Sequence, residues 1–314
     1  MADISVEYVG LKLSSPVVAA PSGSTGTVDL MRVAEDSGIG AVVMRTLYPR
    51  PDQGSVPPHF ELIKHNLGTM RSTTLYSSEH AALWDPDRYA EEIRTSKEHV
   101  RIPIIASIGC VSPSDWVVNY AKQVEHAGAD ALELNLHCPN VVRGEEFGFI
   151  EMVPEVVSLV KSAVKIPVIP KMTPQLENPT LAAMALEKAG ADAVVMFGRF
   201  TGLEIDIDQE QPISRRAYAW HGGPWSIFYS LRWINGTCPW LGIPIAGCGG
   251  VATAEDVIKY ILVGATVVQS CTAIITQGYQ MIKGLNQGLS DWMDRKGYER
   301  TEDFRGHVAR QDLS

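Results

Sequence analysis

The chain has 314 residues, of which 45% are hydrophobic and 20% are charged, a composition typical of a globular protein with a large core. Its net charge of −9 at pH 7 argues against a nucleic-acid-binding protein, which would normally present a basic surface. No apolar run reaches the roughly 18 residues that a membrane span needs, and the first ten residues lack an apolar signal core, so we expect a cytoplasmic protein.

The predicted elements begin with a short β-hairpin over Ile4–Leu13. Eight short apolar runs follow, each too short for a helix and each suited to a strand buried on both faces. Three of them open with Ile-Pro, and a proline at the first position of a strand costs no ladder hydrogen bond. The eight predicted strands are Pro16–Ala20, Ala41–Arg45, Pro103–Ile108, Ala131–Leu136, Pro167–Lys171, Ala193–Phe197, Pro244–Ala246 and Thr266–Gln269.

Amphipathic stretches between these strands predict helices. Trp116–His126, Leu181–Lys188 and Ala254–Leu262 have apolar residues at helical spacing, and each ends close to a glycine, a normal helix stop. Ser112 and Thr253 are candidate N-caps. Strands that alternate with helices eight times predict an α/β fold, a single (β/α)8 barrel domain over residues 1–314. A doubly wound open sheet is the main alternative.

Long connections follow the second, fourth and sixth predicted strands. The first spans residues 47–83 and the last spans residues 199–221. Long loops in a compact domain are usually functional, and barrel active sites lie at the carboxyl ends of the strands. We therefore expect the functional residues in these loops and at these strand ends.

Polar residues gather where the fourth predicted strand ends, in the segment ELNLHCPN from Glu133 to Asn140. Inward polar residues at this position are costly unless a ligand or a partner uses them. A thiol placed there can act as a general acid or base, so we predict that Cys138 is catalytic. The alternative is a buried cysteine beside an asparagine that caps the loop.

Lys171 ends the fifth predicted strand, and a lysine pointing into a barrel mouth needs an anionic partner or a shifted pKa. It would neutralise a ligand or form a Schiff base; the alternative is a surface lysine whose ammonium reaches solvent. Gly247-Cys248-Gly249-Gly250 follows strand seven and Cys271-Thr272 follows strand eight. In barrels these two loops usually bind phosphate, because glycines allow backbone N–H groups to approach it closely.

The cysteines do not form a metal or disulfide pattern. Their number is odd and no two are separated by two residues, so we expect no disulfide framework, zinc site or iron–sulfur site. The five positions are Cys110, Cys138, Cys238, Cys248 and Cys271.

These motifs resemble the dihydroorotate dehydrogenase superfamily. The resemblance rests on the segment 135–140, on Lys171, and on the glycine turns at 222–224 and 249–250. Within the superfamily the chain is similar to the flavin barrel of dihydropyrimidine dehydrogenase, especially its separate bacterial catalytic subunit, whose tail the segment 277–298 resembles. The resemblance covers essentially the whole chain.

The resemblance implies tightly bound FMN and assigns residues by position. Cys138 would exchange a proton opposite flavin N5, and a cationic Lys171 would stabilise the anionic reduced ring. The flavin would be bound by Ala20, Ser22, Gly23, Arg45 and Thr46, and its isoalloxazine would contact Asn135 and Lys171. The phosphate would be held by Gly223, Gly249, Gly250, Cys271 and Thr272. The substrate would contact Ser77, Glu79, Asn135, Asn140 and Arg199.

Three positions depart from the family pattern in the region that recognises the ring. Arg45 replaces a lysine, Ser77 replaces an asparagine with Glu79 kept as an acid, and Phe197-Gly198-Arg199-Phe200 replaces an Asn-Thr or Asn-Ser pair. A site built to hydrogen-bond one ring rejects another strongly, so these changes argue against both dihydroorotate and uracil.

Arg45 and Arg199 instead predict a substrate with a carboxylate, bound by a guanidinium fork. The alternatives are that Arg199 pairs with Glu79 or Asp206, and that Arg45 simply takes the place of the family lysine as a flavin contact.

The predicted function is that of an FMN-dependent oxidoreductase acting on a CH–CH bond next to a carbonyl, in a carboxylate-bearing or cyclic-amide small molecule. The alternatives are a flavin-free lyase or aldolase that uses Lys171 as a Schiff base, and a non-catalytic flavoprotein subunit of an electron-transfer complex. The resemblance also implies a homodimer and a separate iron–sulfur or FAD-containing partner that oxidises NAD(P)H. We expect neither a nucleic acid nor a membrane as a partner.

Overall fold

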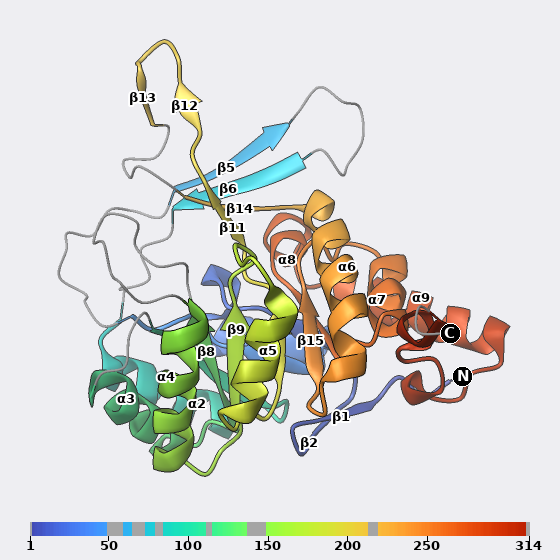
Figure 1. Ribbon diagram of the computed structural model, residues 1–314, viewed down its shortest axis with the longest axis horizontal. Helices are drawn as coiled ribbons and strands as arrows, with labels where there is room; N and C mark the ends of the chain where they lie inside the picture. Colours follow the sequence, from blue (N-terminus) through green and yellow to red (C-terminus); the bar gives the residue numbers. More distant parts are fainter. Residues whose placement is uncertain are drawn as a thin grey trace.

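The computed structural model describes residues 2–48, 59–64, 73–78, 84–110, 115–136, 149–212 and 219–311. Eight parallel strands close into a barrel in the order β10-β15-β16-β3-β4-β7-β8-β9 (Figure 1). The strands are β3 (Val17–Ala19), β4 (Ala41–Val43), β7 (Ile104–Cys110), β8 (Ala131–Leu136), β9 (Val168–Met172), β10 (Val194–Met196), β15 (Ile245–Cys248) and β16 (Val267–Ser270). All eight predicted strands are thus confirmed, with bounds that differ by two residues at most.

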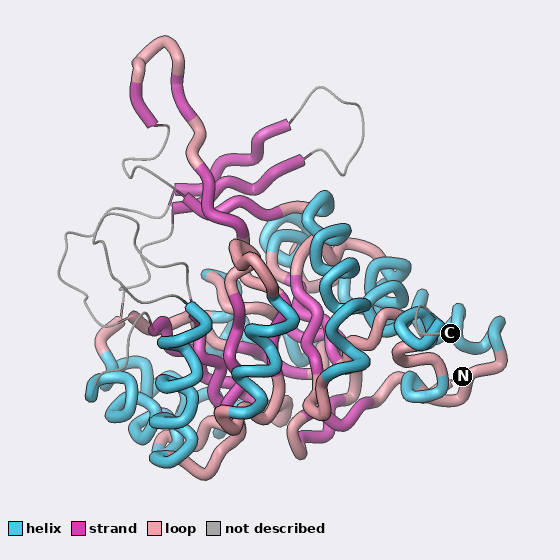
Figure 2. Tube along the Cα trace, viewed as in Figure 1, coloured by secondary structure: helices cyan, strands magenta, loops and turns pink. Residues whose placement is uncertain are grey.

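Helices form an outer ring around the strands (Figure 2). They are α1 (Val28–Asp36), α2 (Pro86–His99), α3 (Asp115–His126), α4 (Phe149–Ala163), α5 (Pro179–Lys188), α6 (Ile227–Thr237), α7 (Ala254–Leu262), α8 (Thr272–Gln277), α9 (Met281–Lys296) and α10 (His307–Gln311). Short 3-10 turns are η1 (Gly23–Thr25), η4 (Pro224–Ser226), η5 (Cys238–Trp240) and η6 (Thr301–Asp303). Thr253 caps α7 as predicted, whereas Ser112 lies outside the described residues. No helix in the described part of the chain is long and apolar enough to span a membrane.

The core has two parts, because the strands are buried on both faces. A large apolar cluster lies between the strands and the helices, and a smaller one fills the barrel interior. The predicted N-terminal hairpin, β1 (Val6–Tyr8) with β2 (Leu11–Leu13), belongs to the interior cluster through Tyr8 and Leu13. The hairpin therefore closes the amino-terminal end of the barrel, so a ligand is expected at the opposite end.

The repeated Gly-Ala-Asp-Ala phrase has a physical role in the barrel. The Asp130 carboxylate accepts a hydrogen bond from the backbone N–H of Ile104 (2.7 Å), in the neighbouring strand, and pairs with Lys97 of α2 (2.7 Å). Asp192 makes the same pair of contacts one unit further along the chain. Each aspartate thus ties a strand to its neighbour and to the helix outside.

The long connections contain structure that the sequence analysis treated as loop. Strands β11 (Phe200–Gly202), β14 (Ala219–Gly222), β6 (Thr73–Ser78) and β5 (His59–Lys64) form an antiparallel sheet in that order. A small hairpin, β12 (Ile205–Asp206) with β13 (Gln211–Pro212), projects beyond this sheet (Figure 1). The prediction omits these segments because it selects continuous apolar runs, whereas β5 (HFELIK), β6 (TTLYSS) and β14 (AWHG) contain polar residues.

Candidate active site

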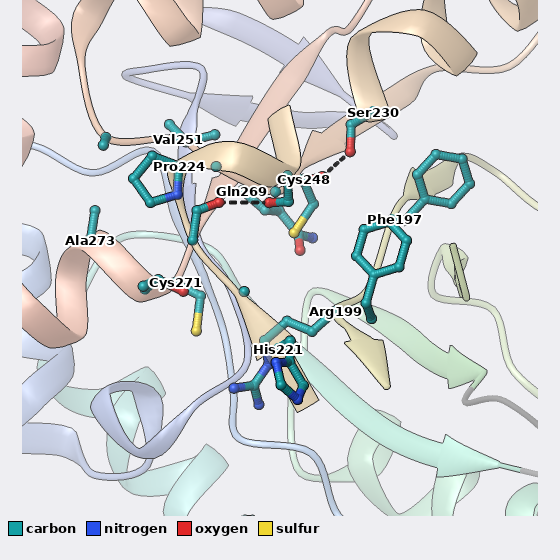
Figure 3. Close-up of a pocket in the computed structure, with 18 of the residues that line it drawn as sticks. Phe197, Arg199, His221, Pro224, Ser230, Cys248, Val251, Gln269, Cys271 and Ala273 are labelled. Carbon is teal, nitrogen blue, oxygen red and sulfur yellow. Dashed lines mark hydrogen bonds between the residues drawn. The ribbon is translucent and has the colours of Figure 1, made fainter. Parts of the chain in front are cut away.

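A cavity of about 260 Å³ opens at the carboxyl ends of the strands, between the barrel and the added sheet. Its walls come from the segments that follow β9, β10, β14, β15 and β16 (Figure 3). The predicted residues that line it are Arg199, Gly223, Gly249, Gly250, Cys271 and Thr272. The phosphate-binding part of the prediction is therefore brought together in one place.

The turn after β15 fits an anionic ligand. Gly249 and Gly250 have φ values of +114° and +72°, in the region that favours glycine. A Cβ on Gly250 would lie 2.7 Å from the backbone nitrogen of Ile227 and 2.8 Å from the carbonyl oxygen of Pro224, so no side chain fits there. No described backbone carbonyl accepts the N–H groups of these two glycines, which remain available for an anion.

The wall beside this turn is also held in place by hydrogen bonds. Ser230, on α6, donates its hydroxyl to the carbonyl oxygen of Cys248 (2.8 Å; Figure 3). Ser226 donates its hydroxyl to the carbonyl oxygen of Gly223 (2.8 Å). Both serines are buried, so the glycine turns are fixed before any ligand binds.

Lys171 is buried in a polar group inside the barrel. Its ammonium donates a hydrogen bond to Oε1 of Gln269 (2.6 Å), and Nε2 of Gln269 donates to Glu133 (2.6 Å). The ammonium also lies 3.6 Å from the other carboxylate oxygen of Glu133. The exposed fractions are 5% for Lys171, 1% for Glu133 and 3% for Gln269. The alternative of a surface lysine whose ammonium reaches solvent is therefore wrong.

Burial by itself lowers the pKa of Lys171, but the electrostatic attraction of Cys248 and Glu133 outweighs burial and leaves that pKa above its ordinary value. A Schiff-base lysine must lose its proton at neutral pH. The surroundings of Lys171 therefore favour a fixed cation over a nucleophile.

Asn135 belongs to a second buried hydrogen-bond chain. Its Nδ2 donates to Oγ1 of Thr46 (3.0 Å), which lies 2.9 Å from Oγ of Ser107. The backbone N–H of Ser107 donates to the hydroxyl of Tyr89 (2.9 Å), whose pKa is raised by burial. The chain fixes the orientation of the Asn135 amide at the end of β8, where the prediction places the isoalloxazine.

The segment after β3 is also shaped in advance. Ala20 and Ser22 are buried, and Ser22 caps the turn η1, which begins at Gly23, by accepting a hydrogen bond from the N–H of Ser24. The backbone N–H of Arg45, just after β4, donates to the carbonyl oxygen of Thr25 in the same turn (3.3 Å). The first two strand ends are thus joined beside the predicted flavin position.

Arg199 and His221 lie side by side at the mouth of the cavity (Figure 3). Burial lowers the pKa of His221, and the charge of Arg199 lowers it further, while Glu204 acts in the opposite direction. The Asp206 carboxylate accepts hydrogen bonds from the N–H groups of Asp208 and Gln209, within the β12–β13 hairpin. Its role in that turn counts against the alternative that Asp206 pairs with Arg199.

Several predicted residues lie where the structure gives no side-chain position. Cys138, Asn140 and Glu79 fall outside the described residues. Ser77 lies in β6, where its backbone pairs with Trp220 of β14. Strand β6 thus belongs to the sheet that covers the cavity.

The prediction omitted Gln269, His221 and the partner role of Glu133. Glu133 was visible in the sequence, since it begins the polar segment at the end of the fourth strand. Gln269 carried a comparable signal, because it is a polar residue inside an otherwise apolar strand. His221 carried no signal beyond its place in a long connection.

Comparison with known proteins identifies the family. The family model for dihydroorotate dehydrogenase matches residues 3–293 of the chain. The chain belongs to the dihydroorotate dehydrogenase family. It is 30% identical to the catalytic subunit of dihydroorotate dehydrogenase B (NAD(+)) from Pyrococcus abyssi, over 96% of this chain and 98% of that protein. The identity is 31% to the Methanosarcina mazei subunit of the same name (95% and 92% covered) and 29% to the Thermoplasma acidophilum subunit (99% and 100% covered).

As a member of the dihydroorotate dehydrogenase family, the chain is an FMN-dependent oxidoreductase that acts on a CH–CH bond. The residues present fit that cofactor. The glycine turn with available N–H groups suits the phosphate, and the Lys171 cation suits a ring that becomes anionic on reduction. The flavin-free lyase alternative is therefore wrong.

Proposed function

We propose that this enzyme interconverts a CH–CH bond and a C=C bond next to a carbonyl in a small carboxylate-bearing substrate. The observation that carries the proposal is the position of Arg199 beside His221 on the wall of the cavity that contains the glycine turns. A guanidinium at such a position matches a carboxylate in geometry and charge. Arg45 is the second candidate for contact with the carboxylate or, alternatively, with the flavin.

The catalytic roles follow from the chemistry of the residues. FMN supplies the hydride acceptor or donor at N5. We assign Cys138 as the general acid or base that moves a proton at the neighbouring substrate carbon. Asn135, oriented by Thr46, and Asn140 would hydrogen-bond the ring or amide of the substrate, with Ser77 and Glu79 contributing from the connection after β4.

Dihydroorotate is the second candidate substrate. The relatives are named dihydroorotate dehydrogenase, and dihydroorotate is itself a carboxylate-bearing cyclic amide. The changes at Arg45, Ser77 and Phe197–Phe200 argue for a different ring. Uracil, implied by the resemblance to dihydropyrimidine dehydrogenase, has no carboxylate and is the weaker candidate.

The relatives are named as catalytic subunits, which supports a separate electron-transfer partner for this chain as well. We propose an iron–sulfur or FAD-containing protein that exchanges electrons with NAD(P)H, and a homodimer of the barrel itself. Rapid turnover of the isolated chain with NAD(P)H alone would rule the partner out. The oligomeric state is measured by light scattering during size-exclusion chromatography.

The deciding experiment is an anaerobic screen of flavin bleaching. The purified FMN-loaded protein is mixed with dihydroorotate, dihydrouracil and a panel of saturated carboxylic acids that carry a carbonyl next to the reacting bond. The proposal expects bleaching by one of the acids and not by dihydrouracil. Rapid reaction with dihydrouracil and none with any acid would overturn the assignment of Arg199.

A further inference from the structure

The charged residues inside the barrel form one connected group. Lys171 comes from β9, Glu133 from β8 and Gln269 from β16, and the Gln269 amide joins the cation to the anion with two hydrogen bonds of 2.6 Å. The direct approach of the ammonium to the carboxylate is longer, at 3.6 Å. The Gln269 orientation is set by charge, because the ammonium needs an acceptor and the carboxylate needs a donor.

This group lies directly under the cavity. Gln269 lines the cavity, together with Cys248 and Cys271, and both thiols act electrostatically on Lys171. An ammonium has three N–H donors. One goes to Gln269 and a second faces Glu133, while the Cys248 thiol, which lines the cavity, is a hydrogen-bond partner of the ammonium on the cavity side.

We propose that Glu133 and Gln269 are positioning residues for the cofactor: Glu133 keeps Lys171 protonated, and Gln269 directs the remaining N–H of Lys171 toward FMN. The proposal rests on the family assignment of FMN and does not depend on the substrate. A lysine buried in an apolar barrel without an anion loses its proton near neutral pH. With Glu133 present, the cation is in place before the cofactor is reduced.

The described groups that face this lysine differ in their ability to supply a negative charge. Burial raises the pKa of the Cys248 thiol above its ordinary value, although the charge of Lys171 acts in the opposite direction, and Cys271 faces Lys171 from the cavity wall. Tyr8, from the N-terminal hairpin, faces Glu133, and burial raises the pKa of its hydroxyl. Glu133 is the one carboxylate among the described groups that act on Lys171.

The test counts protons taken up on reduction. The midpoint potential of bound FMN is measured with dithionite and mediator dyes, from roughly pH 6 to roughly pH 8.5, a range centred near neutrality. In the wild type, reduction of FMN by two electrons should be accompanied by the uptake of one proton, because Lys171 is already protonated before reduction. In Glu133→Gln, Lys171 should be neutral before reduction and should take up a second proton, so the slope of potential against pH should double.

Matched variants separate charge from shape. Glu133→Asp keeps the carboxylate and should keep the wild-type slope. Tyr8→Phe removes a buried hydroxyl that has no hydrogen-bond partner among the described residues, close to the same carboxylate, and should also keep it. A wild-type slope in Glu133→Gln, or a doubled slope in Tyr8→Phe, would overturn the role of Glu133.

Gln269→Leu tests whether Gln269 directs the Lys171 ammonium toward the cofactor. This variant also provides a test of the proposal if Glu133→Gln does not bind FMN. Glu133 remains, so the slope should stay at the wild-type value. The ammonium should turn toward the carboxylate and away from the cavity, and the dissociation constant for FMN, measured by fluorescence quenching, should rise about tenfold, the equivalent of one hydrogen bond to a charged group. An unchanged dissociation constant would overturn the role of Gln269. If the wild type bound no FMN at all, the cofactor assignment itself would fail, which is a different result.

Discussion

The hydroxyl of Tyr260, on α7, donates a hydrogen bond of 2.6 Å to the carbonyl oxygen of Gly249, in the turn after β15. A Cβ on Gly247 would lie 2.3 Å from the same tyrosine ring. Tyr260 is fully buried, so it fills the space beside β15 and fixes one end of the glycine turn. The shape of the glycine turn is therefore set by a residue that does not line the cavity.

The glycine turn gives the first prediction. Gly250→Ala should lower the free energy of unfolding by about 1–3 kcal/mol, because the new Cβ meets backbone atoms and the residue keeps a positive φ. It should also weaken FMN binding at least about tenfold, the equivalent of roughly 1.4 kcal/mol. Urea unfolding and a fluorescence titration with FMN measure the two effects.

The control is another glycine, Gly284, in the exposed face of α9, where a Cβ would meet nothing within 4 Å. Gly284→Ala should raise the free energy of unfolding by about 0.5–1 kcal/mol and leave FMN binding unchanged. A loss of FMN affinity in this variant would show that the assay responds to stability and not to the turn.

The second prediction concerns the buried ion pair. Lys171→Met leaves the buried Glu133 carboxylate without a cation, with only the Gln269 amide beside it. The substitution should lower the free energy of unfolding by about 3–5 kcal/mol. The double variant Lys171→Met/Glu133→Gln removes both charges and should recover most of that loss. Chemical denaturation of the four proteins completes the cycle, and additive costs would mean that the two charges do not interact.

The third prediction concerns Cys138. Cys138→Ala should slow flavin reduction by substrate on the order of 10²–10⁴-fold, the usual share of a general acid or base, while FMN stays bound. Cys138→Ser should keep part of the rate, because a hydroxyl transfers protons less readily. Stopped-flow bleaching provides the measurement, and a full rate in Cys138→Ala would show that the catalytic residue is a different one.

The fourth prediction concerns Arg199. Arg199→Met should weaken binding of a carboxylate substrate by roughly 2–5 kcal/mol, because the carboxylate is left unpaired. It should have a much smaller effect on a neutral ligand such as uracil. Titration of the oxidised enzyme with an unreactive carboxylate analogue, and with uracil, separates the two. Equal losses for both ligands would indicate a general disturbance of the cavity.

The sequence predicted the barrel well because its strands carry a strong local signal. Runs such as Val194–Met196 are apolar and buried on both faces, and the Gly-Ala-Asp-Ala phrase precedes two of the strands, at 128–131 and 190–193. Strands β5 and β14 carry no such signal, since each contains polar residues, and β14 pairs with β6, which lies far away in the chain.

The candidate site was predicted in part for the same reason. Gly249, Gly250 and Lys171 follow or end predicted strands, so their place at the barrel mouth followed from the fold. The hydrogen bonds by which Gln269 joins Lys171 to Glu133 could not be predicted in this way. Gln269 is separated from Lys171 by almost a hundred residues and reaches it only when the barrel closes. Partners across a closed barrel depend on register, which local periodicity does not contain.

The sheet that covers the cavity is assembled from two connections. Strands β5 and β6 come from the segment after β4, and β11 and β14 from the segment after β10; Tyr76 pairs with His221 across the junction. Each connection forms its own antiparallel pair, and each supplies a hydrogen-bonding edge for the other where β6 meets β14. In evolution or engineering, the two would have to be exchanged together, as one inherited unit. A barrel that received only one of them would carry an open edge over its cofactor and lose the wall that presents Arg199.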